Sequence, residues 1–308
     1  MLRLSVAYLP AKVLLLLFLS IASTAVSAEA FEILVEPDWL NQRLGQKNLV
    51  ILDARSPAMF AKGHIEGAVN LPVSSTYNPN PPKTRLAPEN HISQLFGDAG
   101  IGDDSVVVVY DDGIFKDAAR VTWSLWVYGH SKAAMLSINY AGWKNQNRPT
   151  SLITTKPEAK KFTSRLQPEH LVTQLHTQLA IQDSETILVD VRSAEEYRGE
   201  KSESRRYGHI PTAMSYDWHL MAVHENQAIR LKTRAELQAL FADIPRGTKV
   251  IAYCNKGKEA ALGNFALNLL GYDVSLYDGG WYEWGNSLDL PVEGPDQAPL
   301  QSLNPTND

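Results

Sequence analysis

The chain has 308 residues, of which 44% are hydrophobic and 20% charged, with 7 Trp and 12 Tyr. This composition is ordinary for a folded protein and excludes disorder along most of the chain, while the length accommodates one large domain or two ordinary ones. The 29 Lys and Arg against 34 Asp and Glu give a net charge of −5, which argues against a nucleic-acid partner.

The N-terminus, residues 1–28, predicts a secretory signal peptide. Basic residues precede an apolar run at 13–22, and small residues follow up to Ala28, as in cleaved signals. The run is shorter than the roughly 20 residues that a membrane span needs, and an uncleaved anchor is the alternative. We expect cleavage after Ala28, with a cut after Ala30 as the alternative. The mature protein is then expected to be periplasmic or secreted, with no stable membrane association.

The rest of the chain contains one pattern twice, in a first and a second copy. In the first copy, an apolar strand beginning at Leu49 ends in Asp53-Ala54-Arg55, and Gly63-His64-Ile65 follows. In the second copy, a similar strand ends in Asp190-Val191-Arg192, and Gly208-His209-Ile210 follows. Such self-similarity indicates two related structural units rather than one large domain.

Later in each copy, a second apolar strand and a Gly-Trp motif recur. Residues 105–111 match residues 248–254, so Asp111 occupies the position of Cys254. Helix-like segments at 118–128 and 260–270 follow these strands. Continuous Val and Ile strands that alternate with helices predict an α/β fold, with a parallel sheet flanked by helices in each copy.

This pattern sets the expected domain boundaries. The first domain is expected at residues 32–147 and the second at 169–295. The polar, proline-containing segment 148–168 is predicted to be the linker, and residues 296–308 are expected to form a tail.

Cys254 is the only cysteine, so an intramolecular disulfide is excluded. An inert buried thiol is the alternative to a reactive one, because free cysteine packs as a small hydrophobe. The residue nevertheless stands at the carboxyl end of a buried strand and just before a helix, where parallel sheets bind ligands. Gly257 relaxes the backbone of the following loop, so several main-chain amides can face the sulfur. These amides, together with the helix N-terminus and Lys256, would all favour the thiolate. The sequence therefore predicts that Cys254 is a nucleophile.

These motifs resemble the rhodanese family over nearly all of residues 32–295. The resemblance rests on both Asp-x-Arg turns, both Gly-His-Ile motifs, Cys254-Asn255-Lys256-Gly257 and the segment 277–284. It implies tandem rhodanese-like domains, with the catalytic cysteine in the second copy and an acidic residue at the matching site of a non-catalytic first copy. It also implies sulfurtransferase activity, in which Cys254 takes sulfur from a small anionic donor as a persulfide and passes it to cyanide or a thiol. No metal or cofactor is implied.

The resemblance further implies a donor-binding role for Arg192 and for the loop residues Asn255, Lys256, Gly257, Lys258 and Glu259. A structural ion pair is the alternative for Arg192, because the first copy repeats the motif at Arg55, and a solvated surface position is the alternative for Lys256. His64 and His209 are expected to brace turns.

The loop sequence bears on the donor. Cys-x-Lys-Gly resembles the thiosulfate-using branch of the family, whereas the mercaptopyruvate-using branch usually has Cys-Gly-Ser-Gly. The loop also departs from the family, because Asn255 replaces a frequent Arg and Lys258-Glu259 replaces a pair that is commonly apolar then hydroxyl-bearing. Glu259 either pairs with Lys258 in solvent or points inward and weakens anion binding. Thiosulfate is the expected donor, and 3-mercaptopyruvate is the alternative.

Two other classes of function were weighed. A cysteine phosphatase needs an arginine six positions after its nucleophile to grip phosphate, and this chain has Ala260 there. A non-catalytic binding module is the second alternative, which Cys254 argues against for the second copy.

Overall fold

A computed structural model describes residues 31–226 and 228–295 of the chain. Residues 32–295 belong to one compact unit. The predicted signal peptide and the predicted tail lie outside the described residues.

The first copy runs through thirteen elements in chain order. They are β1 (Leu34–Val35), α1 (Pro37–Asn41), β2 (Leu49–Asp53), α2 (Pro57–Phe60), β3 (His64–Ile65), β4 (Val69–Asn70), η1 (Val73–Thr76), α3 (Glu89–Asp98), β5 (Val106–Tyr110), α4 (Lys116–Val127), β6 (Ala133–Leu136), α5 (Tyr140–Asn145) and β7 (Thr150–Ser151).

The second copy follows with a similar succession of strands and helices. Its elements are η2 (Pro168–His170), β8 (Leu171–Val172), α6 (Gln174–Ala180), β9 (Thr186–Asp190), α7 (Ala194–Tyr197), β10 (Met214–Ser215), η3 (Trp218–Met221), β11 (Ala222–Glu225), β12 (Ala228–Leu231), α8 (Arg234–Leu240), β13 (Lys249–Tyr253), α9 (Lys258–Leu269), β14 (Asp273–Tyr277) and α10 (Gly280–Trp284).

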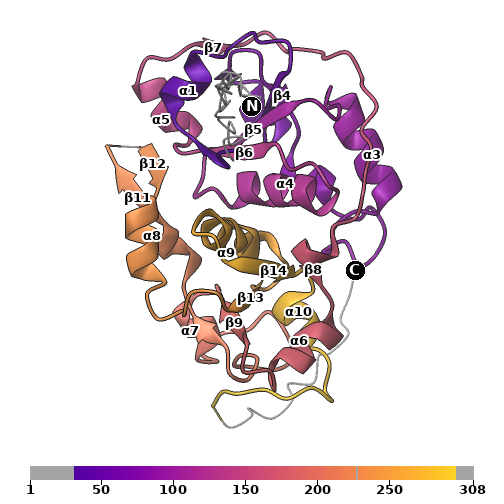
Figure 1. The fold of residues 1–308 in the computed structure, drawn as a ribbon, viewed down its shortest axis with the longest axis vertical. Helices are drawn as coiled ribbons and strands as arrows, with labels where there is room; N and C mark the ends of the chain where they lie inside the picture. The colour runs from indigo at the N-terminus through magenta and orange to yellow at the C-terminus, as the bar shows by residue number, and fades with distance from the viewer. Residues whose placement is uncertain (1–30, 227, 296–308) are drawn as a thin grey trace, which may run out of the picture. The chain divides into compact units, whose positions relative to one another are not determined.

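Within the described residues, each copy contains a five-stranded parallel sheet (Figure 1). The strand order is β1-β6-β5-β2-β4 in the first copy and β8-β14-β13-β9-β10 in the second, so equivalent strands occupy equivalent places. The central pairs keep the same register, with Ile51 opposite Val108 and Leu188 opposite Ile251. The predicted α/β fold with two tandem parallel sheets is confirmed.

Helices α4 and α9 face each other between the two sheets (Figure 1). Most residues of both helices are buried, because each helix packs on its own sheet with one side and on the other helix with the opposite side. Apolar character all around a helix is the expected mark of such a position. Trp126 of α4 stacks on Phe265 of α9 with ring centroids 5.6 Å apart. The first turns of the two helices also meet, where Lys116 pairs with Glu259 and Lys258 with Asp117.

Two further segments join the copies. The antiparallel hairpin β11–β12 of the second copy docks on the first, where the Asn139 amide donates to the Ile229 carbonyl at 2.9 Å. The segment predicted as the linker runs along the first copy, and the Arg165 amide donates to the Tyr128 carbonyl at 3.0 Å. The two copies therefore share polar backbone contacts as well as an apolar interface.

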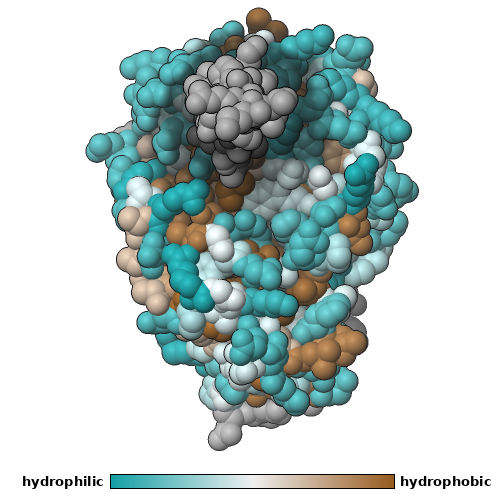
Figure 2. Space-filling model, in the orientation of Figure 1, coloured by the Kyte–Doolittle hydropathy of each residue, from teal (hydrophilic) through white to brown (hydrophobic). Residues whose placement is uncertain are grey.

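The surface is more polar than the buried interior of the two copies. Figure 2 shows a mainly hydrophilic face, with hydrophobic side chains gathered over α6, where Leu175 and Leu179 are exposed. Among the described residues, no helix has both the length and the apolar character needed to cross a membrane.

Candidate active site

Cys254 follows the last residue of β13 and is 1% exposed. The Gly257 amide donates to the Cys254 sulfur at 3.1 Å. Gly257 has a φ of +78° and stands at the N-cap of α9, a conformation that glycine adopts without strain. A Cβ at this position would lie 2.2 Å from Asp278 Oδ1. The turn that aims the amide at the sulfur therefore requires glycine.

In the equivalent loop of the first copy, backbone amides surround an acidic side chain. Asp111 replaces the cysteine, and its carboxylate accepts hydrogen bonds from the amides of Gly113 at 3.0 Å, Asp117 at 3.1 Å and Ala118 at 3.1 Å. Converging amides before a helix form an anion-binding concavity. In the first copy the Asp111 side chain fills this concavity, so the loop keeps its conformation without a reactive cysteine.

Asp111 gives the stability of the protein a specific pH dependence. Burial, followed by the nearby Asp117 charge, raises the pKa of Asp111 to about 6 from an ordinary 3.8. Because the native pKa lies above the unfolded one, the contribution of Asp111 to stability is complete below about pH 4 and is lost as pH rises through 6. At about 1.4 kcal/mol for each tenfold change in proton affinity, this loss is about 3 kcal/mol.

Asp111→Asn resembles the protonated side chain and does not titrate. We expect the free energy of unfolding of Asp111→Asn, minus that of the wild type, to increase by about 3 kcal/mol between pH 4 and pH 7.5. Urea unfolding at several pH values measures this difference. A difference that stays constant over the range would contradict the assignment.

The Cys254 thiol is less acidic than the loop sequence suggests. Burial and then the Glu259 charge raise its pKa, while the amides of Ala260 and Lys256 lower it. The predicted influence of the loop amides thus has the correct sign, but burial and Glu259 outweigh it. The resting thiol is protonated at neutral pH, and its proton must leave when the sulfur reacts.

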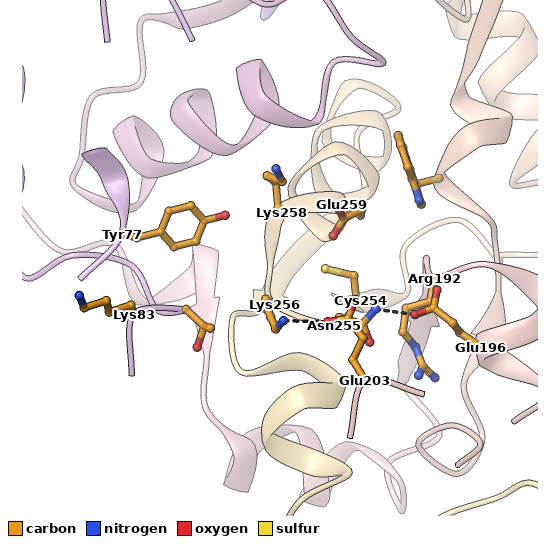
Figure 3. A pocket seen from close by; sticks show the side chains of 12 residues that line it. Tyr77, Lys83, Arg192, Glu196, Glu203, Cys254, Asn255, Lys256, Lys258 and Glu259 are labelled. Atoms are coloured by element: carbon orange, nitrogen blue, oxygen red, sulfur yellow. Dashed lines mark hydrogen bonds and ion pairs between the residues drawn. The ribbon is translucent and has the colours of Figure 1, made fainter. Parts of the chain in front are cut away.

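A cavity of about 370 Å³ opens in front of Cys254 between the two copies (Figure 3). This volume lies in the range of small-molecule sites. Its lining residues are Tyr77, Lys83, Thr84, Arg192, Glu196, Glu203, Trp218, Cys254, Asn255, Lys256, Lys258 and Glu259. The first copy therefore supplies one wall of the site.

Arg192 lines this cavity, but its guanidinium group is engaged in the turn. It pairs with Asp190 at 2.6 Å, donates to the Gly208 carbonyl at 2.8 Å and is 1% exposed. Arg55 makes the same contacts with Asp53 and the Gly63 carbonyl. In Figure 3 the guanidinium group points away from the Cys254 sulfur. This arrangement is the structural ion pair that was the alternative for Arg192.

The two histidines of the Gly-His-Ile motifs contact backbone carbonyls near these turns. His64 Nδ1 lies 3.1 Å from the Phe60 carbonyl, and His209 Nδ1 lies 2.8 Å from the Tyr197 carbonyl. Both rings stack on the preceding aromatic residue, at 3.8 and 3.7 Å between centroids. These contacts match the bracing role expected from the sequence.

Lys256 and Asn255 point to the carboxylates of the second copy (Figure 3). Lys256 Nζ lies 2.7 Å from Glu203, and its side chain is 41% exposed. Asn255 Nδ2 donates to Glu196 at 2.6 Å. Lys256 is therefore a half-exposed, paired cation at the mouth of the cavity. This environment resembles a solvated surface position, which was the alternative to donor binding for Lys256.

Lys258 and Glu259 are paired with the first copy and not with each other. Lys258 Nζ lies 3.1 Å from Asp117, and Glu259 Oε1 lies 3.3 Å from Lys116. The Glu259 carboxylate lies on the same side as the Cys254 sulfur (Figure 3). Of the two alternatives for Glu259, the structure shows the inward one.

The first copy contributes residues to the site that the sequence does not predict. Tyr77, Lys83 and Thr84 lie across the cavity from the loop. Beneath the loop, Arg120 of α4 pairs with Asp278 and donates to the Gly257 carbonyl at 3.3 Å. Asp278 stands before the Gly-Gly-Trp motif, which was recognised as a repeat marker but not as a support of the catalytic loop.

Comparison with known proteins identifies the family of the chain. The model of the rhodanese-like domain matches residues 36–146 and 172–287. The chain belongs to the rhodanese family. It is 31% identical to the thiosulfate sulfurtransferase of Azotobacter vinelandii, over 85% of this chain and 97% of that one. It is 30% identical to the 3-mercaptopyruvate sulfurtransferase of Escherichia coli K12, over 84% of this chain and 97% of that one.

The fold likeness extends to solved structures. The crystal structure of SseA from Escherichia coli, described as a 3-mercaptopyruvate sulfotransferase, matches with a TM-score of 0.71 and 28% identity. The match covers 81% of this chain and 98% of SseA. Both copies are therefore part of the shared architecture.

Proposed function

We propose that this protein is a thiosulfate sulfurtransferase that carries the transferred sulfur on Cys254. The observation that carries the proposal is the position of Cys254, at a strand end facing the cavity, with the Gly257 amide 3.1 Å from its sulfur. Relatives of both the thiosulfate and the 3-mercaptopyruvate type cover almost the whole described chain. The first copy, with Asp111 at the matching position, is proposed to be non-catalytic.

The reaction proceeds in two displacements. The Cys254 sulfur loses its proton to solvent and attacks the outer sulfur of thiosulfate; the S–S bond of thiosulfate breaks and sulfite leaves with the bonding electron pair. Cyanide or a thiolate then attacks the outer sulfur of the Cys254 persulfide, and thiocyanate or a new persulfide leaves. The amides around Cys254 stabilise the sulfur anion in both steps through fixed dipoles.

3-Mercaptopyruvate is the second candidate donor. The inward carboxylate of Glu259 favours it, because a doubly charged donor is repelled more strongly than a singly charged one. Side-by-side thiocyanate assays with the two donors decide between them. Turnover with thiosulfate supports the main proposal, and turnover with mercaptopyruvate alone assigns the second. If neither donor leaves cyanide-labile sulfur on the protein, the non-catalytic module is the better description.

Lys256 offers a further test of how the donor is held. Its ammonium group is half-exposed and already paired with Glu203, so its loss should cost no more than an exposed ion pair. We expect Lys256→Ala to lower kcat/KM for thiosulfate by less than about tenfold. A loss of 100-fold or more, on the order expected for a buried charged hydrogen bond, would show that Lys256 abandons Glu203 to bind the donor directly.

We also propose that the mature protein begins at Glu29 and is periplasmic or secreted. The layout of residues 1–28 supports this proposal. Intact-mass measurement of the protein from its native cells tests it, and a retained N-terminus in a cytosolic fraction would refute it.

A further inference from the structure

Two crossed ion pairs join the first turns of α4 and α9. Lys116 of α4 reaches Glu259 of α9 at 3.3 Å, and Lys258 of α9 reaches Asp117 of α4 at 3.1 Å. Each helix thus begins with a lysine followed by an acid, and each residue pairs with its opposite in the other copy. Glu259, one of the loop residues that depart from the family pattern, has its counter-ion in the copy without cysteine.

Glu259 is the member of this group that faces the reactive sulfur. Its side chain is 22% exposed and that of Lys116 is 32% exposed, so solvent screens the pair only in part. Burial alone would raise the pKa of Glu259, but the amide at the start of α9 and the charge of Lys116 outweigh burial and lower it. Glu259 is therefore ionised at neutral pH and places a negative charge beside Cys254.

A negative reagent must approach Cys254 against this charge. Lys258 is paired with Asp117 and Lys256 with Glu203, so each of these cations has a carboxylate of its own beside it. The Lys116 ammonium group lies 4.5 Å from the ring centroid of Trp218, a residue of the cavity wall. Its positive charge thus lies directly behind two residues of the cavity wall, Trp218 and Glu259, and opposes the charge of Glu259.

We propose that Lys116 is a specificity-determining residue, which offsets Glu259 so that anionic reagents can reach Cys254. Only the identity of the physiological anion rests on the function proposed above; the selection for charge is a property of the site itself. Lys116 acts through the electrostatic potential at the sulfur, and it takes no part in bond making.

Alkylation of Cys254 tests this role without any sulfur transfer. Iodoacetate and iodoacetamide are similar in size, but only iodoacetate is an anion, so the ratio of their rates reports the potential at the sulfur. A change in thiol pKa or in access affects both reagents and cancels in the ratio. The measurement uses the full mature chain and follows the mass of the protein over time.

We expect Lys116→Gln to lower the iodoacetate-to-iodoacetamide ratio by about fivefold to tenfold, and Glu259→Gln to raise it by a similar factor. The double variant restores the net charge and should return to within about twofold of the wild type. Lys144→Gln is the matched control, because Lys144 also lies over an aromatic ring, at 5.7 Å from the centroid of Tyr140, but Tyr140 does not line the cavity, whereas Trp218 does. Its ratio should not change.

The proposal is wrong if Lys116→Gln leaves the ratio unchanged, or if the double variant stays at the level of Lys116→Gln. A purely structural role of Lys116 would produce the first result, since loosening of the interface affects both reagents alike. Steady-state kinetics then separate the two proposals. If the ratio shifts as expected but thiosulfate gives no turnover, the proposed function fails alone. If thiosulfate is turned over and the ratio does not shift, the role of Lys116 fails alone.

Discussion

Cys254→Ser should abolish sulfur transfer, lowering turnover by at least about 10³-fold. A serine hydroxyl fits the loop, but it cannot form the S–S bond that carries the sulfur between the two displacements. Thiocyanate formation measures the loss, and the mass of the protein after exposure to the donor shows directly whether one sulfur atom is added. The wild type should gain that mass, and Cys254→Ser should not.

Asp111→Ala is the matched control for this experiment. Asp111 holds the equivalent position in the first copy, and its carboxylate is bound by the amides of Gly113, Asp117 and Ala118. Its removal leaves those amides without their anion and costs stability, yet it changes no group that contacts Cys254. Most of the activity should remain. Sulfur transfer that survives in Cys254→Ser would refute the persulfide mechanism.

The parts of the fold that the sequence predicts are those governed by local pattern. Strands such as β5 and β13 are buried on both faces, so they appear as continuous apolar runs. The helices after them begin at Lys116 and Lys258, two residues before the predicted segments. Since equivalent strands end at the same sheet edge, the equivalence of Asp111 and Cys254 could also be found by alignment of the two copies alone.

The missed parts of the site depend on contacts between residues far apart in the sequence. Arg120 and the Gly257 carbonyl are separated by 137 positions, and Lys116 and Glu259 by 143. No local pattern shows which residues of one helix will face the other copy. The partner of Arg192 could not be decided from the sequence for a different reason, because Asp190, two residues before it, is as available to the guanidinium group as an anionic donor would be.

Arg120→Met should be strongly destabilising, by about 3–5 kcal/mol, because it leaves a buried carboxylate without its counter-ion. Arg120 is fully buried and Asp278 is nearly so. With methionine in place, Asp278 keeps the Leu86 amide at 2.6 Å as a donor, but its charge has no cation beside it. The Gly257 carbonyl also loses its partner, so kcat/KM should fall together with the free energy of unfolding. Urea unfolding and thiocyanate kinetics measure the two effects.

Arg85 and Glu283 provide the matched control, because they too join an arginine of the first copy to a carboxylate of the second. Their side chains are 29% and 31% exposed, so Arg85→Met should cost no more than about 1 kcal/mol.

A second variant isolates the charge: Arg120→Met with Asp278→Asn removes both ions and should be more stable than Arg120→Met alone. If the double variant is the less stable of the two, the cost comes from lost packing of the guanidinium group between Tyr77 and Trp123. The first copy would then support the catalytic loop through shape and not through charge.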